Sequence, residues 1–161
     1  MTRDLETASL PYRPCAGIML LNKHNAIFVG ERLDGQASGI WQMPQGGIDP
    51  GEEPASAAMR EMEEEIGTRN AEIIAETPDW LTYDLPADLR GKVWRGRYRG
   101  QKQKWFLLRF LGTDAQINLQ TEHPEFSAWK WTDTDALVAE VIDFKRDIYR
   151  QVRSAFAAHL V

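Results

Sequence analysis

One stretch of the sequence clusters acidic side chains in a way that suits metal-ion chemistry. It runs from Gly46 to Thr68, and within it Glu61, Glu64 and Glu65 stand at relative positions i, i+3 and i+4. On an α-helix these positions share one face, where like charges repel by about 0.2–0.5 kcal/mol per exposed pair. Mg²⁺ and Mn²⁺ take oxygen ligands and bridge carboxylates to substrate phosphates, which would relieve the repulsion. From these residues alone, a solvated acidic helix is the alternative.

The same stretch carries the signals of the helix that these acids require. Pro54 suits the first helical turn, where its missing N–H has no partner to lose, and Gly67 suits the end. A glycine-rich loop, residues 46–51, leads into the helix. Apolar residues recur at the spacing that faces a core; they are Ala55, Ala58, Met59, Met62 and Ile66.

The spacing of the fixed residues resembles the Nudix box, G-x5-E-x7-R-E-U-x-E-E-x-G-U, in which U is apolar. The resemblance implies an α+β protein, the Nudix α/β/α sandwich with a mixed central β-sheet, forming one domain over residues 1–161. It also implies a pyrophosphohydrolase that acts on phosphoric anhydrides. Thr68 departs from the last apolar position, which is a packing site. The matching residues are Gly46, Glu52, Arg60, Glu61, Met62, Glu64, Glu65 and Gly67.

The resemblance assigns expected roles within the site. Mg²⁺ is the expected cofactor, with Mn²⁺ or another divalent ion as the alternative. Spacing does not identify the catalytic base, for which we favour Glu61. Glu52 and Arg60 are expected to pair and hold the loop to the helix. Gly67 is expected to end that helix. Glu125 is a further candidate ligand, and the alternative is that it is a solvated loop acid. The expected catalytic residues are Glu61, Glu64 and Glu65, and the expected metal ligands are these three with the Gly46 carbonyl and Glu125.

Blocks outside the box resemble one branch of the family, over roughly residues 12 to 153. This branch contains bacterial RNA 5′-pyrophosphohydrolases and the diadenosine polyphosphate hydrolases of bacteria and plants. The resemblance is carried by segments such as Trp41–Ile48, Trp80–Pro86 and Tyr98–Phe106. We predict removal of pyrophosphate from the 5′-triphosphate end of RNA. The alternative is hydrolysis of diadenosine tetra- or pentaphosphate with ATP as one product. A catalytically silent nucleotide-binding module is disfavoured, because all the box carboxylates are present.

A nucleoside polyphosphate needs cations for its outer phosphates and an aromatic face for its base. Lys102 and Lys104 alternate on a predicted strand and are expected to point toward the phosphates. Tyr83 and Phe144 are candidates for stacking a base, a contact of about 1–3 kcal/mol. Core packing is the alternative for the aromatic residues, and a solvated strand edge for the lysines. The full set of predicted substrate-binding residues is Arg32, Tyr83, Arg99, Lys102, Lys104, Phe144 and Lys145.

Charge and cysteine content limit the possible partners. The net charge of −5 argues against tight non-specific binding of long nucleic acid and favours small nucleotides, as does the lack of a basic tail before Val161. Residues 90–104, in contrast, carry only basic charges. No apolar run approaches the ~20 residues of a membrane span, and residues 1–14 lack a signal peptide's apolar block. Cys15 is the only cysteine, so a cytoplasmic location with no membrane partner is expected, with Cys15 in the core. The oligomeric state stays open.

These residues need a scaffold, and the apolar pattern predicts a sheet with helices packed on it. A short helix is expected after Asp133 or Thr134, and an amphipathic C-terminal helix that includes Phe144, Ile148 and Val152. Residues 86–100 are expected to form a basic loop. The predicted strands are Cys15–Leu21, Ala26–Glu31, Trp41–Gln45, Ala71–Thr77, Trp80–Leu85, Lys104–Leu111, Ala115–Leu119 and Phe126–Trp131.

Overall fold

A mixed β-sheet forms the centre of the protein in the computed structural model, which describes residues 10–33 and 39–160. Its main path runs β3-β2-β1-β7-β5, while β4 pairs with β1, β6 with β7 and β8 with β2. β1 and β7 run parallel, and the other pairs are antiparallel. The strands are β1 (Tyr12–Leu21), β2 (Ile27–Arg32), β3 (Trp41–Gln42), β4 (Gln45–Gly47), β5 (Ala71–Glu76), β6 (Leu81–Asp84), β7 (Gly100–Phe110) and β8 (Phe126–Thr132).

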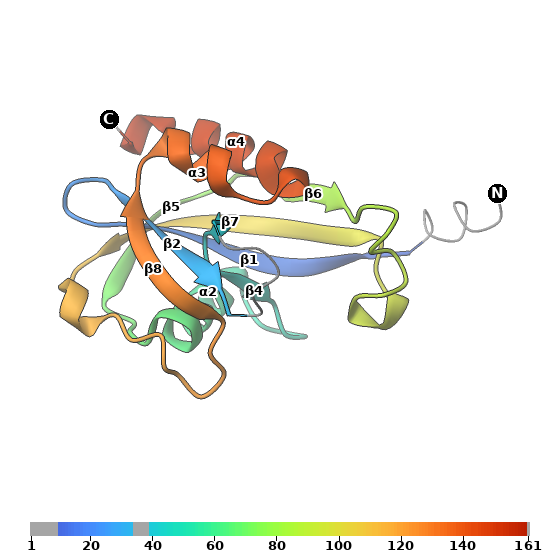
Figure 1. The fold of residues 1–161 in the computed structure, drawn as a ribbon, viewed down its shortest axis with the longest axis horizontal. Coiled ribbons are helices and arrows are strands. Elements are labelled where there is room, and N and C mark those ends of the chain that lie inside the picture. Colours follow the sequence, from blue (N-terminus) through green and yellow to red (C-terminus); the bar gives the residue numbers. More distant parts are fainter. Residues whose placement is uncertain (1–9, 34–38, 161) are drawn as a thin grey trace.

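Helices cover both faces of this sheet (Figure 1). α2 (Pro54–Ile66) lies on one face, and α3 (Thr134–Glu140) and α4 (Arg146–Ala155) lie on the other. Each face has its own apolar cluster: Phe106 and Leu108 pack with α2 residues, whereas Trp105 and Leu107 pack with residues of α3 and α4. Alternate residues of β7 therefore serve opposite layers. The fold is the expected Nudix α/β/α sandwich with a mixed central sheet.

β1 is the strand on which the two layers meet. Residues from Cys15 to Leu21 are all buried, which explains their nearly continuous apolar sequence. The strand begins at Tyr12, three residues before the predicted start, because its backbone pairs with β7 from Tyr12↔Gly100 onward. For the same reason β7 begins at Gly100 rather than at the predicted Lys104.

Two predictions of strands need correction. The predicted strand Ala115–Leu119 is wrong: the chain forms a 3-10 turn over Asp114–Gln116, and Asn118 N donates to Ile66 O at 2.8 Å. Its backbone thus bonds the end of α2 instead of a strand. The predicted strand Trp41–Gln45 is divided into β3 and β4, since Pro44 has no N–H for a ladder.

The C-terminal elements follow the prediction with one change. Asp133 caps α3 by accepting a hydrogen bond from Ala136 N at 2.8 Å. Ile148 and Val152 form the buried side of α4, but Phe144 lies before that helix, in a 3-10 turn over Asp143–Lys145. In the described part of the chain, no helix has the length and apolar character to cross a membrane. The first nine residues, part of the stretch used to judge a signal peptide, lie outside the described residues.

Candidate active site

The helix α2 places the box acids at two different depths. Its buried residues form adjacent i, i+4 rows, Ala57-Glu61-Glu65 and Ala58-Met62-Ile66. Glu61 and Glu65 therefore lie along the core-facing surface, whereas the Glu64 side chain is 53% exposed. The rows begin at Ala57, so Ala55, predicted to face the core, is exposed instead. Gly67 ends the helix as expected, with a left-handed φ of 85°.

Two buried carboxylates, Glu61 and Glu65, concentrate negative charge in the site, and the guanidinium of Arg60 bonds Glu61. Burial raises the pKa of Glu65 well above its ordinary value, and the negative charges of Glu61 and Glu125 raise it further. Burial also raises the pKa of Glu61, and repulsion from the negative charge of Glu64 is the second cause. Glu65 Oε2 is buried without a hydrogen-bond partner among the described residues. A divalent metal ion would supply the missing partner, and the chemistry of these oxygen donors fits such an ion.

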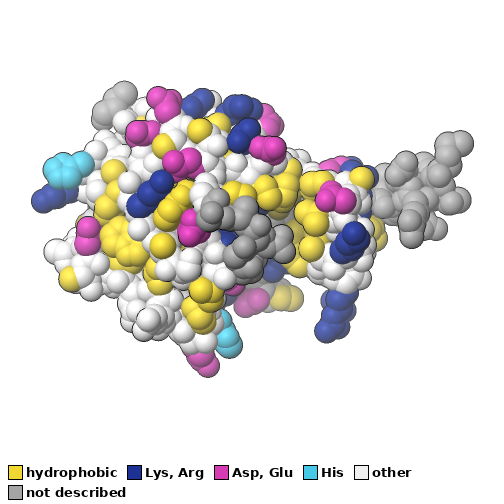
Figure 2. All heavy atoms as spheres, viewed as in Figure 1, with side chains coloured by type: hydrophobic (Ala, Val, Ile, Leu, Met, Phe, Trp, Pro, Cys, Tyr) yellow, Lys and Arg dark blue, Asp and Glu magenta, His cyan; other side chains and the backbone are white. Residues whose placement is uncertain are grey.

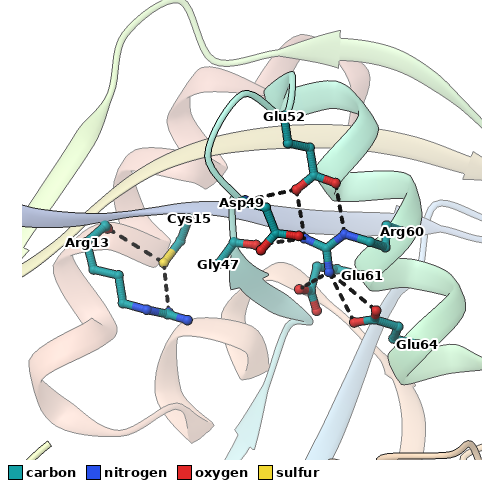
Figure 3. Close-up of polar contacts among 8 residues, drawn as sticks. All are labelled: Arg13, Cys15, Gly47, Asp49, Glu52, Arg60, Glu61 and Glu64. Carbon is teal, nitrogen blue, oxygen red and sulfur yellow. Dashed lines mark hydrogen bonds and ion pairs between the residues drawn. The ribbon is translucent and has the colours of Figure 1, made fainter. Parts of the chain in front are cut away.

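Arg60 joins the loop before α2 to the helix (Figure 3). Its Nε and Nη2 donate to Glu52 Oε2 and Oε1, both at 2.8 Å, and Nη2 also donates to Gly47 O at 2.9 Å. This is the predicted Glu52–Arg60 pair. The contacts on the other side of the guanidinium were not predicted: Nη1 donates to Glu61 Oε1 at 3.0 Å and to Glu64 Oε2 at 3.2 Å.

Arg60 consequently contacts two of the acids, Glu61 and Glu64, that would also contact a bound metal ion. Its Nη1 bonds Glu61 and Glu64, whereas the buried Oε2 of Glu65 has no hydrogen-bond partner among the described residues. Among residues 10–33 and 39–160, no three acidic, histidine or cysteine side chains are already grouped as a metal site. Glu64 is half exposed and carries the longer of the two Arg60 bonds, so it is the acid with the most freedom to reorient.

Gly46 gives the Glu61 carboxyl group its space. β4 pairs with β1 so that Gly46 stands opposite Ala16, and this brings the Gly46 backbone against the helix. A Cβ added at Gly46 would lie 2.0 Å from the carboxyl carbon of Glu61, a distance that no packed structure tolerates. A glycine is therefore required here by close approach rather than by an unusual backbone angle.

The acids line one part of a cavity of about 580 Å³. The rings of Tyr83 and Phe144 pack against each other in its wall, with centroids 5.7 Å apart and planes tilted by 38°. Lys145 is buried there, and burial lowers its pKa to about 8, with a further contribution from the nearby charge of Arg32. The predicted site residues that line this cavity are Arg32, Gly46, Glu61, Glu64, Glu65, Tyr83, Glu125, Phe144 and Lys145.

Three predicted substrate-binding residues, Arg99, Lys102 and Lys104, lie outside the cavity lining. Lys102 and Lys104 occupy the alternate positions of β7, which face away from Gln101 and Gln103. Lys104 Nζ donates to Thr77 O at 2.9 Å, and Lys102 Nζ lies 4.9 Å from the centre of the Trp80 ring.

Arg99 is occupied elsewhere for a different reason. Its Nη2 donates to Asp84 Oδ2 at 2.9 Å, and its guanidinium lies 4.8 Å from the centre of the Tyr12 ring. Tyr12 OH donates to the other carboxylate oxygen of Asp84 at 2.6 Å. The cluster connects the start of β7 to the end of β6 and the start of β1. The contacts of Arg99 with Asp84 and Tyr12 are therefore structural.

Gln101 and Arg13 are among the cavity residues that were not predicted from the sequence. Gln101 is buried in the lining, and its Oε1 accepts a hydrogen bond from Gln103 Nε2 at 2.6 Å. Arg13 also lines the cavity; its guanidinium lies 5.4 Å from the centre of the Trp94 ring and donates to Cys15 Sγ at 3.3 Å. Side chains alternate between the two faces of the sheet along β1 and β7, and this alternation is visible in the sequence. It does not show which of the two faces meets the site.

Comparisons with known proteins agree with this geometry. The RNA pyrophosphohydrolase of Roseobacter denitrificans is 57% identical over 157 residues, covering 96% of this chain and 98% of the relative. The RNA pyrophosphohydrolase of Rhodospirillum rubrum is 58% identical, covering 98% of this chain and 94% of the relative. Among solved structures, the E. coli dihydroneopterin triphosphate pyrophosphohydrolase superposes with a TM-score of 0.65 at 21% identity, covering 88% of this chain and 96% of that one. The NUDIX domain model matches residues 11–152, and this protein belongs to the Nudix family of hydrolases.

Proposed function

We propose that this Nudix hydrolase removes pyrophosphate from the 5′-triphosphate end of RNA. One observation carries the proposal: a single cavity has buried carboxylates in one part of its lining, and an aromatic pair with the buried Lys145 and the exposed Arg32 in another. A nucleoside polyphosphate has the matching order of groups, because its phosphates follow directly on the nucleoside. The relatives named RNA pyrophosphohydrolase, at 57% and 58% identity, support RNA as the nucleoside-bearing molecule.

Nudix hydrolases use divalent metal ions, and we propose Mg²⁺ here, with Mn²⁺ or another divalent ion as the alternative. Glu61, Glu64 and Glu65 would hold it with the Gly46 carbonyl, and Glu125 would join them from the loop before β8. When bound, such an ion lowers the pKa of water and neutralises phosphate oxygens. The unpartnered Glu65 oxygen supports this assignment.

The remaining steps belong to the side chains of this chain. Glu61 is the proposed base: it lines the cavity beside Glu64 and Glu65, where it can accept a proton from the attacking water. The new P–O bond forms from that water while a phosphoanhydride bond breaks. Loss of diphosphate in one cleavage, or of orthophosphate in each of two successive cleavages, leaves a 5′-monophosphate end. Lys145 and Arg32 offset the charge of phosphates, while Phe144 and Tyr83 support the base.

The alternative is a diadenosine polyphosphate hydrolase, which would yield ATP and AMP from the tetraphosphate. The net charge of −5 favours such a small substrate. Purified protein with Mg²⁺ should be offered triphosphorylated RNA and diadenosine tetraphosphate in competition. We expect kcat/KM to favour RNA by more than ~100-fold, about 2.7 kcal/mol of differential transition-state binding. A preference of the same size for diadenosine tetraphosphate would replace the RNA proposal with the alternative.

We further propose that residues 1–161 form one Nudix domain and that the protein works in the cytoplasm. The first part is supported by the packing of α2, α3 and α4 on one sheet. The second is supported by the single cysteine, Cys15, which is a buried free thiol.

A further inference from the structure

The segment between β6 and β7, residues 86–99, is a compact lobe rather than an extended linker. Leu85 N donates to Arg99 O at 2.8 Å, so the ends of the lobe are joined. Within it, Leu89 N bonds Pro86 O at 2.9 Å and Gly96 N bonds Val93 O at 3.0 Å. Closed ends and internal hydrogen bonds are the features of an Ω-loop, a type of loop that frequently has a function. We call residues 86–99 the basic lobe.

The basic lobe contains backbone conformations that a passive connection does not need. Trp94 and Arg95 have φ values of 49° and 57°, in the left-handed region that non-glycine residues rarely occupy. Such residues are expensive to hold, and they persist where the surrounding contacts determine them. Here Trp94 packs against the guanidinium of Arg13, whose Nη2 in turn lies against Gly47, where an added Cβ would come within 2.6 Å. The lobe is thus anchored beside the box.

The inner and outer sides of the basic lobe differ in chemistry. Leu89, Val93 and Trp94 line the cavity that also contains the box glutamates. The outer side carries Lys92, Arg95 and Arg97, all exposed. Figure 2 shows Lys and Arg side chains projecting from this end of the molecule. The lobe therefore presents apolar side chains to the cavity and basic side chains to solvent.

The other two basic residues of the lobe have structural partners. Arg90 Nε donates to Leu85 O at 2.8 Å, and Arg99 bonds Asp84. The lobe contains one acid, the exposed Asp88, against the three exposed cations, and from residue 90 to residue 104 the sequence contains no acid. In a protein whose net charge is −5, this concentration of positive charge is local.

Resting on the proposed function, we propose that the basic lobe binds the backbone phosphates of the RNA downstream of the nucleotides held in the cavity. Lys92, Arg95 and Arg97 contact these phosphates without reading the sequence, because phosphate contacts position a strand and carry no base information. A dinucleoside polyphosphate has no downstream backbone to reach them. The lobe accordingly selects a long RNA 5′ end over a short nucleotide, although both present the same polyphosphate to the acids.

The test compares two triple variants on three substrates. The lobe variant is Lys92→Gln, Arg95→Gln, Arg97→Gln; the control, Lys23→Gln, Arg69→Gln, Arg150→Gln, removes the same charge from exposed positions on other elements. The substrates are a 5′-triphosphorylated RNA of about 20 nucleotides, longer than the ~4–16 nucleotides of a typical single-strand site, the 5′-triphosphorylated dinucleotide with the same first two residues, and diadenosine tetraphosphate. Initial rates are measured with Mg²⁺ from low to moderate salt.

For the lobe variant we expect kcat/KM on the long RNA to fall by about 10-fold at low salt, with KM rising rather than kcat falling. Its logarithm should depend on the logarithm of salt with a slope about two units less steep than in the wild type, the value for three lost phosphate contacts. The dinucleotide and diadenosine tetraphosphate should be hydrolysed at rates within about twofold of the wild type. The control variant should behave like the wild type on all three.

Two results overturn the inference while leaving the proposed function intact. One is equal activity of the lobe and control variants on the long RNA. The other is an equal loss by the lobe variant on all three substrates, which would make the lobe part of the general architecture. If instead the wild type releases neither diphosphate nor orthophosphate from either RNA but cleaves diadenosine tetraphosphate, the proposed function fails, and the inference fails with it.

Discussion

The carboxyl carbon of Glu61 lies where a side chain on residue 46 would begin: a Cβ on Gly46 would come 2.0 Å from it. The loop backbone and the acidic helix are therefore in contact at this point. Because Glu61 is 8% exposed and is already bonded to Arg60, it has little space in which to retreat.

Gly46→Ala should lower kcat by on the order of 100-fold, since a displacement of about 1 Å at a reacting group has effects of this size. Steady-state hydrolysis with Mg²⁺ measures it. The matched control is Gly51→Ala in the same loop, where the added methyl group has nothing within 4 Å. That variant places alanine at a φ of 78° and should lose stability but keep its kcat. Wild-type turnover by Gly46→Ala would contradict the role of this contact.

Glu64→Gln should bind substrate but lose nearly all turnover, by at least about 100-fold, because a neutral amide is a poor substitute for a carboxylate that holds a metal ion. Glu63→Gln on the same helix is the control, since Glu63 is exposed and pairs with Arg69 at 3.3 Å. Substrate affinity is measured by equilibrium titration and turnover by product release. If Glu64→Gln turns over at the wild-type rate, the metal assignment is wrong.

Glu52→Gln should destabilise the metal-free protein by about 1.5–3 kcal/mol at pH 7, because it breaks a two-point bond with the Arg60 guanidinium. Hydrogen bonds from Arg60 lower the pKa of Glu52 from 4.5 to about 2. A depressed carboxyl pKa stabilises the folded state above the unfolded pKa, and that stability is lost as the pH falls toward 2.

The stability difference between wild type and Glu52→Gln should therefore shrink by roughly half at pH 3. Urea unfolding with EDTA at pH 7, 5, 4 and 3 measures it. Glu53→Gln, at the exposed neighbouring position, provides the control and should show little difference at any pH. A difference that stays constant from pH 7 to pH 3 would show that the Glu52 carboxylate does not carry this part of the stability.

Cys15 should be unreactive in the native protein. It is 0% exposed, and burial raises the pKa of its thiol to about 11. The thiolate is the nucleophile, so alkylation at pH 8 should be at least ~100-fold slower than for the unfolded chain. Mass spectrometry after timed iodoacetamide treatment, with and without urea, measures this. Native-state labelling at the unfolded rate would place the thiol in a more accessible position.

Local sequence signals determined the helix that carries the chemistry. α2 begins at Pro54 and ends before Gly67, as the capping rules predict. Helical geometry then brings its glutamates, spaced i, i+3 and i+4, to neighbouring positions. The Glu52–Arg60 pair was also predictable, since both residues lie within the box and one of them needs a countercharge. Propensity, capping and periodicity act over a few residues, and so a single sequence records them.

The tertiary structure decided which side chains face the cavity. Alternation along β7 was visible in the sequence, but only the packing of Trp105 and Phe106 on opposite layers shows that Gln101, and not Lys102, lines the site. Likewise Arg13 and Trp94 meet across 81 residues of sequence by the pairing of β1 with β7. Strand parity and long-range contacts depend on which surfaces are buried together, a property of the whole chain that no short stretch contains.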